Sequence, residues 1–187
     1  MVRRKPEAVI DDERDDGYRP TFDDEQYVDV SGRPRWRRNT ELAAHLRRLQ
    51  DFLLIGGYPD SHALRYGRLA LEIDQLGESV ALVEKEGRLK RIRGVGPDIA
   101  NMITEFLKKG TTSKYEWWKR ETPESVLGLL DIPGFGVKTV RTLYMVYAIK
   151  NLADVRCALD NGTLDGVREV GPKTLANVRR YLDERTV

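Results

Sequence analysis

Residues Leu130–Tyr144, which read LDIPGFGVKTVRTLY, decide the fold of this chain. The stretch opens with two apolar residues, Leu130 and Ile132, and then turns through Pro-Gly-Phe-Gly. The two glycines of this turn can take backbone angles that a Cβ atom forbids, and they let another backbone come close. After the turn, apolar residues recur at the i, i+3, i+4, i+7 spacing of a buried helical face: Val140, Leu143, Tyr144 and Tyr147. The stretch therefore predicts two helices joined by a glycine hairpin.

The start of the second helix offers a site for an anion. Lys138 and Thr139 fall in its first turn, just after the glycines. The free N–H groups there, together with the positive end of the helix dipole, attract negative charge. A helix, a glycine hairpin and a second helix with a lysine at its start form the pattern of the helix-hairpin-helix DNA-binding motif. An ordinary helix-to-helix turn capped by glycines explains a single such stretch equally well.

Repetition favours the first interpretation. Leu89–Phe106 reads LKRIRGVGPDIANMITEF, with Gly94 and Gly96 in the places of the two central glycines. Val167–Leu182 reads VREVGPKTLANVRRYL, and its Gly171 matches the second of them. The three units lie 40 and 35 residues apart. An internal repeat is stronger evidence than a single motif, so we expect the chain to bind the phosphate backbone of a nucleic acid.

Length and composition set broad bounds. A chain of 187 residues suggests one or two domains and is long enough for a real core. The net charge of +2 says little about partners, since many nucleic-acid binders are far more basic. The single cysteine, Cys157, lies in a helical context and is expected to be a small packed residue in a reducing compartment. With no membrane-length apolar run and no visible signal peptide, we expect a cytoplasmic, nucleoid-associated protein without a membrane partner.

Residues 1–38 are expected to form a disordered charged tail. Asp11–Asp29 holds nine acidic and two basic residues, a net charge of −7, and four arginines follow between positions 33 and 38. Apolar periodicity is absent from this segment. The tail could simply aid solubility. Alternatively, its acidic stretch competes with DNA for a basic face while the arginines hold phosphate.

Two helical domains are predicted after the tail, over residues 39–110 and 111–187. Asn39 or Thr40 can cap the first helix, and Asp60 or Ser61 can start the second. A third short helix over residues 79–86 precedes the first hairpin unit, which closes the first domain near Gly110. The second domain holds the other two units. No strand signal of useful length is found, so the chain is predicted to be all-α.

Aromatic residues and histidines outside the repeats have alternative interpretations. In the connector TTSKYEWWKRE, Tyr115, Trp117 and Trp118 could stack on bases between basic neighbours. More often such residues anchor one domain against another, and we favour that interpretation. His45 and His62 have no partners at the spacing of metal ligands, so we expect them at a surface or an interface.

The order of these parts resembles the N-terminal half of family X DNA polymerases. The resemblance covers about residues 39–182 and includes four stretches: RYGRLALEI, LKRIRGVGPDIANMITEFL, LLDIPGFGVKTVRTLY and IKNLADVRCAL. It implies tandem helix-hairpin-helix domains, with a four-helix lyase-like domain followed by a smaller helical domain. In that family the first domain grips the 5′ side of a DNA gap, and the second grips the duplex near the primer end.

The resemblance also implies a set of ligand-binding positions. Backbone carbonyls of each hairpin would hold a monovalent cation, Na⁺ or K⁺, that bridges to a DNA phosphate, and no other cofactor is expected. These carbonyls would belong to Leu130, Ile132 and Phe135, and to Lys90, Ile92 and Val95. The positions expected to contact DNA are Gly134, Phe135, Gly136, Lys138, Thr139 and Arg141 in the second unit, Gly94, Val95, Gly96 and Ile99 in the first, and Gly171, Lys173 and Thr174 in the third.

The sequence departs from the family pattern at functional positions. No pair of metal-binding aspartates with a Gly-Ser loop follows the matched region, so we expect no polymerase active site. Met102 stands where lyase-competent relatives have the lysine that forms a Schiff base. Asp98 replaces a phosphate-binding lysine, and Glu169 replaces the first glycine of the third unit. We therefore expect a protein that is not an enzyme.

These observations predict a non-catalytic DNA-binding module. It would contact the sugar-phosphate backbone without sequence specificity, because backbone contacts carry no sequence information, and it would act in DNA repair at gaps, nicks or junctions. One alternative is a 5′-deoxyribose-phosphate lyase. Another is an adaptor whose Trp117–Trp118 surface and tail bind a repair protein while the hairpins only hold the fold. DNA binding should weaken with salt, whereas an apolar adaptor contact should not.

Overall fold

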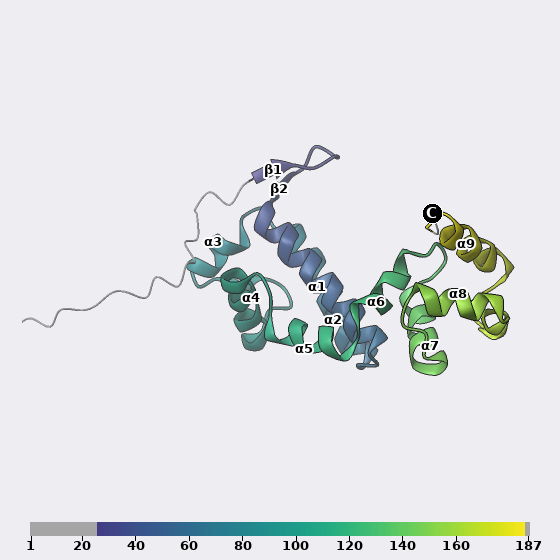
Figure 1. The fold of residues 1–187 in the computed structure, drawn as a ribbon. Coiled ribbons are helices and arrows are strands. Elements are labelled where there is room, and N and C mark those ends of the chain that lie inside the picture. Colours follow the sequence, from purple (N-terminus) through teal and green to yellow (C-terminus); the bar gives the residue numbers. More distant parts are fainter. Residues whose placement is uncertain (1–25, 186–187) are drawn as a thin grey trace, which may run out of the picture.

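The computed structural model describes residues 26–185, which are mostly helical (Figure 1). The described part of the chain holds nine α-helices: α1 (Arg37–Ile55), α2 (Asp60–Asp74), α3 (Val80–Lys85), α4 (Pro97–Lys109), α5 (Ser113–Glu121), α6 (Glu124–Leu127), α7 (Val137–Tyr147), α8 (Leu152–Asp160) and α9 (Pro172–Asp183). Three short 3-10 helices lie between them: η1 (Leu89–Arg91), η2 (Gly128–Asp131) and η3 (Thr163–Gly166). The helical class predicted from the sequence is confirmed for the bulk of the chain.

A small β-hairpin precedes the helices and corrects the sequence-based prediction. Strands β1 (Gln26–Val28) and β2 (Pro34–Trp36) pair antiparallel. The turn between them is ordered by Asp29, whose carboxylate accepts hydrogen bonds from the N–H groups of Ser31 and Arg33. The prediction of no strand, and that of a disordered tail reaching residue 38, are therefore wrong over residues 26–38. The rest of the predicted tail, residues 1–25, lies outside the described residues.

Helix α1 begins earlier than the sequence predicted. Trp36, the last residue of β2, is its N-cap, so the strand continues directly into the helix. Asn39 does not cap α1; its side chain is buried and joins two elements. Its amide Nδ2 donates to the carbonyl of Glu78, 2.9 Å away, and its Oδ1 accepts from the N–H of Val80 at 2.7 Å. Asn39 thereby fixes α1 against the start of α3.

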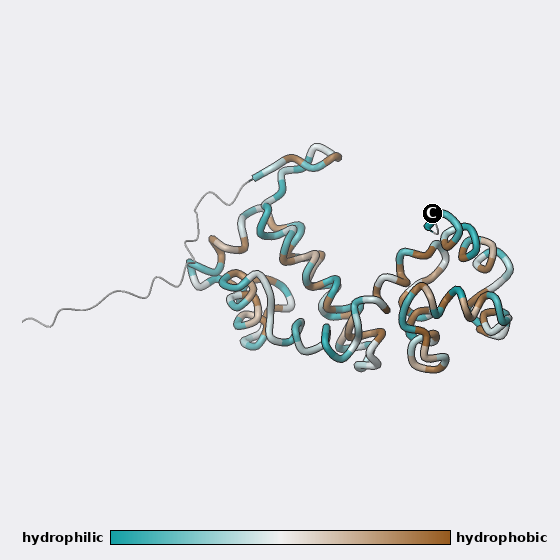
Figure 2. The backbone as a smooth tube through the Cα atoms, in the orientation of Figure 1, coloured by the Kyte–Doolittle hydropathy of each residue, from teal (hydrophilic) through white to brown (hydrophobic). Residues whose placement is uncertain are grey.

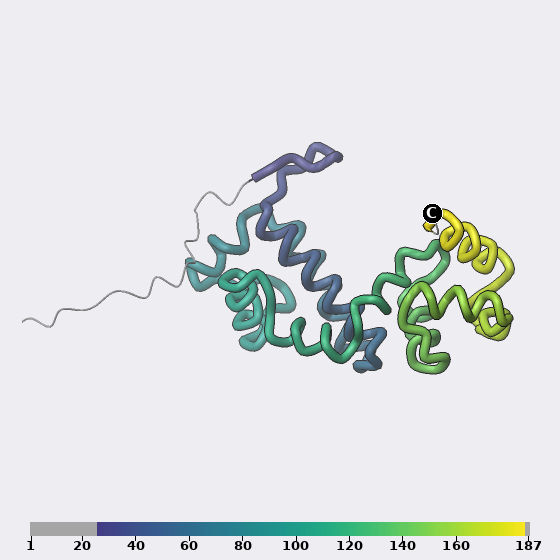
Figure 3. The backbone as a smooth tube through the Cα atoms, in the orientation of Figure 1, coloured from purple at the N-terminus to yellow at the C-terminus, as the bar shows by residue number. Residues whose placement is uncertain are grey.

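Two hydrophobic clusters fill the interior, and α1 contributes to both. The first cluster holds the inward residues of α1 to α4, including Leu46, Ile73 and Ile103. The second is formed mainly by α6 to α9, but Phe52 and Ile55 from the end of α1 belong to it. We call the part that holds α1 to α5 the first lobe and the part that holds α6 to α9 the second lobe. In Figure 1, α1 runs through the first lobe on the left, and its end lies towards the second lobe. Figure 3 shows the chain passing from one lobe to the other after α5.

The connector helix α5 packs at the junction of the two clusters. Trp118 contacts both of them and meets the ring of Tyr58 edge-on, with 5.6 Å between the ring centroids. A Cβ atom on Gly56 would lie 2.6 Å from the Trp118 ring, so the close approach requires glycine. Trp117 points outward and is 47% exposed. The anchoring role favoured from the sequence fits Trp118, and it does not fit Trp117.

Hydrophobic and hydrophilic residues are interspersed along each helix, as Figure 2 shows. Within residues 26–185, no helix combines the length and the apolar character that crossing a membrane requires. Cys157 is exposed on α8, which corrects the expectation of a packed residue.

Candidate nucleic-acid interface

The first hairpin unit runs from η1 through a tight turn into α4. The N–H of Ile92 donates to the carbonyl of Leu89 at 3.0 Å, and the N–H of Val95 donates to the carbonyl of Ile92 at 3.1 Å. Gly94 occupies the third turn position with a φ of +85°, the conformation that a type II turn requires there. Gly96 is the N-cap of α4. The turn therefore delivers the chain directly to an exposed helix start.

The second hairpin unit repeats this geometry. The N–H of Ile132 donates to the carbonyl of Leu129 at 3.2 Å, and that of Phe135 donates to the carbonyl of Ile132 at 2.9 Å. Gly134 has a φ of +98°, and Gly136 is the N-cap of α7. The predicted repeat of the first two units is thus present in the backbone hydrogen bonds as well as in the sequence.

The third unit keeps the hydrogen bonds but changes the turn. The N–H of Val167 donates to Leu164 at 3.2 Å, that of Val170 donates to Val167 at 2.8 Å, and Gly171 is the N-cap of α9. Glu169 holds the glycine position, and its φ is not positive. Without a left-handed residue at its third position, this turn is not of the type II found in the first two units.

The side chains expected to contact DNA in the second unit differ in accessibility. Lys138 projects into solvent with 84% of its side chain exposed. Thr139 and Phe135 are buried, so their side chains are not available to a ligand. Arg141 is held by the first lobe, because its Nη1 donates to the Asp60 carboxylate at 2.8 Å. Lys138 is thus the cation of this helix start that projects furthest into solvent.

The other two units offer less positive charge. In the first, Gly94 and Gly96 are exposed, Val95 is buried and Ile99 is half-buried. Asp98 is exposed in the first turn of α4 and places a negative charge there. In the third unit, Gly171 and Lys173 are exposed and Thr174 is half-buried.

The second and third units are neighbours in space. A Cβ atom on Gly134 would lie 3.2 Å from Cγ2 of Thr174, so the turn of one unit meets the helix start of the other. Glu169 reaches the lysine of the second unit, with 3.8 Å between its Oε1 and Nζ of Lys138. Sequence reasoning missed this contact, because only the tertiary packing of the repeats places them side by side.

The carbonyl groups expected to bind a cation divide into two kinds. Those of Ile92 and Ile132 already accept a turn hydrogen bond. Those of Lys90, Val95, Leu130 and Phe135 accept none of the turn and cap hydrogen bonds found in the described residues. Oxygen atoms of this kind suit hard cations such as Na⁺ and K⁺.

Two residues of the first lobe bear on the lyase interpretation. Met102 is buried and packs in the first hydrophobic cluster. Its side chain has no amine. The amine found near Tyr66 is that of Lys114 on α5, whose Nζ lies 5.3 Å from the Tyr66 ring centroid and 5.0 Å from that of Tyr58. This placement could not be inferred from the sequence, in which Lys114 is only one residue of a basic connector.

His45 lies at an interface between helices. Its ring stacks on Tyr115 with 4.3 Å between centroids, and its Nε2 lies 3.1 Å from the hydroxyl of Thr112. Burial lowers the pKa of His45 to about 4, and nearby Glu116 opposes that shift only weakly. The imidazole is therefore neutral near pH 7.

Comparison with known proteins finds a distant relative. Over 122 residues the chain is 26% identical to the DNA polymerase/3′-5′ exonuclease PolX of Bacillus subtilis (strain 168). The match covers 65% of this chain but only 20% of that protein, so the chain corresponds to about a fifth of its relative. No protein-family model matches the chain. The similarity supports a distant relationship to PolX.

Proposed function

We propose that this protein is a non-catalytic DNA-binding module that grips the sugar-phosphate backbone through helix-hairpin-helix units. The observation that carries this proposal is the shared geometry of the first and second units, in which a left-handed glycine leads to an exposed glycine N-cap. The relationship to PolX adds weight, because that relative is named as a DNA polymerase and exonuclease. A DNA-related role is the common element of both arguments.

The chemistry of the second unit suits a phosphate group. The free N–H groups at the start of α7 point away from the helix, and the helix dipole adds positive potential there. A Cβ atom on Gly136 would meet nothing within 4 Å, so the backbone stands open to a large anion. Lys138 supplies a full positive charge in the same turn. Such contacts position DNA without distinguishing its sequence.

A monovalent cation would complete each site. Carbonyl groups of Leu130, Ile132 and Phe135 would hold Na⁺ or K⁺ in the second unit, and those of Lys90, Ile92 and Val95 would do so in the first. The cation would bridge to a phosphate oxygen. Its contribution is tested by exchanging Na⁺ or K⁺ for tetramethylammonium, which is too large for a carbonyl site, at constant ionic strength.

We place the protein in DNA repair, at gaps, nicks or junctions, where two hairpin units can engage backbone on both sides of a discontinuity. Because PolX is matched over only a fifth of its length, its polymerase and exonuclease activities are not transferred to this chain. A cytoplasmic, nucleoid-associated location follows from this role.

The proposal is tested by titrating the protein against labelled single-stranded, duplex, nicked and gapped DNA over a range of salt concentrations. Contacts to about 3 to 6 phosphates give a slope of roughly −3 to −5 in a plot of log affinity against log salt. Duplexes of equal shape and unrelated sequence should bind alike. A flat salt response, or strong discrimination between such duplexes, would contradict the proposal.

A further inference from the structure

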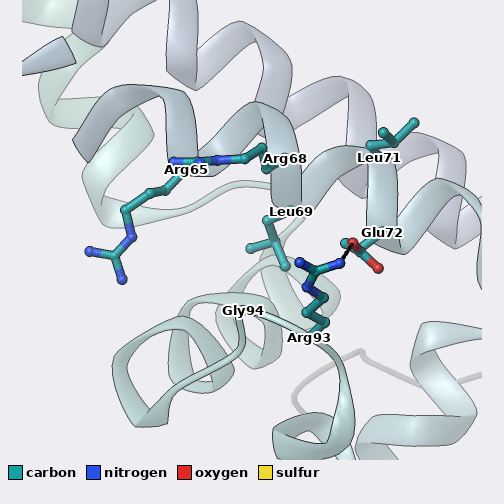
Figure 4. A pocket seen from close by; sticks show the side chains of 7 residues that line it. All are labelled: Arg65, Arg68, Leu69, Leu71, Glu72, Arg93 and Gly94. Carbon is teal, nitrogen blue, oxygen red and sulfur yellow. Dashed lines mark ion pairs between the residues drawn. The ribbon is translucent and has the colours of Figure 1, made fainter. Parts of the chain in front are cut away.

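An open cavity beside the first hairpin unit has no role in the function proposed above. Its volume is about 420 Å³, and it lies between α2 and the turn that leads to α4. Three arginines line it, Arg65 and Arg68 from α2 and Arg93 from the turn, as Figure 4 shows. Gly94, next to Arg93, forms part of the wall.

The charges around this cavity are unbalanced. Glu72 is the one carboxylate in the lining, and its Oε1 lies 3.8 Å from Nη1 of Arg93. Arg65 and Arg68 form no ion pair within the described residues, although they lie three positions apart on the same helix face. Like charges at this spacing repel one another, so an anion bound between them would relieve the repulsion.

The lining also indicates the kind of anion. A guanidinium group matches the oxygens of a phosphate through two parallel hydrogen bonds, and three arginines line this cavity. The lining includes the apolar side chains of Leu69 and Leu71 but no aromatic ring on which a base could stack. The cavity therefore suits a phosphate group better than a nucleotide base.

The position of the cavity accounts for a weakness of the first unit. Asp98 in the first turn of α4 repels a phosphate from that helix start. The corresponding helix start in the second unit stays open to a phosphate. Positive charge is found instead on the other side of the hairpin turn, at Arg93 and on the facing residues of α2. The exposed backbone of Gly94 has no atom within 4 Å of its Cβ position, so a strand can approach the cavity closely.

We propose that the cavity formed by Arg65, Arg68 and Arg93 binds a backbone phosphate of the same DNA that the second hairpin unit holds. This inference rests on the proposed function and adds a contact that the helix starts do not provide. The first lobe then grips DNA mainly through arginine side chains, whereas the second lobe uses backbone N–H groups and Lys138.

The test compares the variants R65A/R68A and Arg120→Ala on gapped DNA. Arg120 is an exposed arginine of α5 that lines neither site, so its variant shows the effect of losing one surface charge elsewhere. Loss of the contact to this phosphate should weaken binding roughly tenfold at moderate salt and reduce the log–log salt slope by about 1. Arg120→Ala should change the affinity less than about twofold. Thermal unfolding of each variant confirms that it is folded.

The outcomes separate this inference from the proposed function. If R65A/R68A binds as Arg120→Ala does while Lys138→Glu binds weakly, the cavity is not a DNA contact and the hairpin proposal stands. If neither R65A/R68A nor Lys138→Glu weakens binding, the cavity inference and the proposed function are both overturned.

A second measurement identifies the source of the phosphate. The Nε–Hε signals of the arginines are followed by NMR during titration with a short duplex and, separately, with inorganic phosphate. The proposal expects the Arg65 and Arg68 signals to move with micromolar duplex and to need a far higher concentration of inorganic phosphate. Movement with inorganic phosphate but not with the duplex would overturn it in favour of a small-anion site.

Discussion

Glu169 lies against Lys138, with 3.8 Å between the carboxylate Oε1 and the lysine Nζ. The carboxylate comes from the turn of the third unit and the amine from the helix start of the second. The Glu169 side chain is only 20% exposed, so its position is fixed more firmly than that of Lys138. An ion pair with one solvent-exposed partner adds little stability, but it lowers the positive potential at the site where we place a phosphate.

Replacing Glu169 with Gln should therefore strengthen DNA binding. We expect a gain of about two- to fivefold at low salt, because the removed charge repels phosphate in the second unit, and a smaller gain at high salt because of screening. Fluorescence anisotropy with gapped DNA measures the effect. Asp160→Asn is the matched control, since it removes an exposed carboxylate from α8. Equal gains in both variants would show that only the net charge matters.

Gly134 should be required for stability, and Gly136 should not. Alanine at Gly134 must adopt a φ of +98°, and its Cβ would lie 3.2 Å from Thr174. We expect a loss of about 1 to 2 kcal/mol in the free energy of unfolding. Gly136→Ala introduces no contact within 4 Å and no left-handed strain, so denaturant unfolding should give a much smaller change. Similar losses in the two variants would contradict the turn geometry described here.

His45 should make the stability of the fold depend on pH. Its pKa is lowered from 6.5 to about 4 in the folded state because the ring is buried. The unfolded chain therefore binds this proton more readily, and the contribution of neutral His45 is complete above about pH 6.5 and is lost as the pH falls towards 4.

The measurement is the melting temperature of wild type and of His45→Phe between pH 7.5 and 4.5. The variant keeps an aromatic ring beside Tyr115 and Phe106 but cannot bind the proton. Its melting temperature should fall less over this range than that of the wild type. Parallel curves would show that His45 does not titrate as described.

The protein should lack lyase activity. A Schiff base needs an amine beside the deoxyribose phosphate, and the expected position holds Met102, which is buried. Borohydride treatment in the presence of DNA with a 5′-deoxyribose phosphate should yield no covalent adduct. Lys114 is the residue to examine, because its amine lies near Tyr66. An adduct at Lys114 that is lost in Lys114→Ala would favour the enzyme interpretation.

The sequence predicted the parts of the fold that are encoded locally. The glycine pairs and their offsets located the first two turns, and Pro97 and Pro172 stand at the first turns of α4 and α9, where proline is favoured. It failed at the β-hairpin, because β1 and β2 have three residues each and depend on the Asp29 hydrogen bonds rather than on an apolar alternation.

The features that depend on tertiary packing could not be predicted. Phe52 and Ile55 lie on a helix assigned to the first domain, yet they pack in the second cluster. The contact of Glu169 with Lys138 joins residues 31 positions apart, and the arginine cavity brings together Arg68 and Arg93, which are 25 positions apart. No periodicity within either segment indicates which surface it will face.

The central claim is that phosphate approaches the backbone at the start of α7, and Gly136→Leu tests it most directly. Gly77→Leu is the control, because a Cβ atom at either glycine meets nothing within 4 Å and neither has a positive φ. Binding to gapped DNA is measured for both variants at a temperature where each is folded. We predict that Gly136→Leu weakens binding at least about tenfold, the loss of one to two charge-assisted contacts, while Gly77→Leu binds as wild type does. Wild-type affinity in a folded Gly136→Leu variant would contradict the claim.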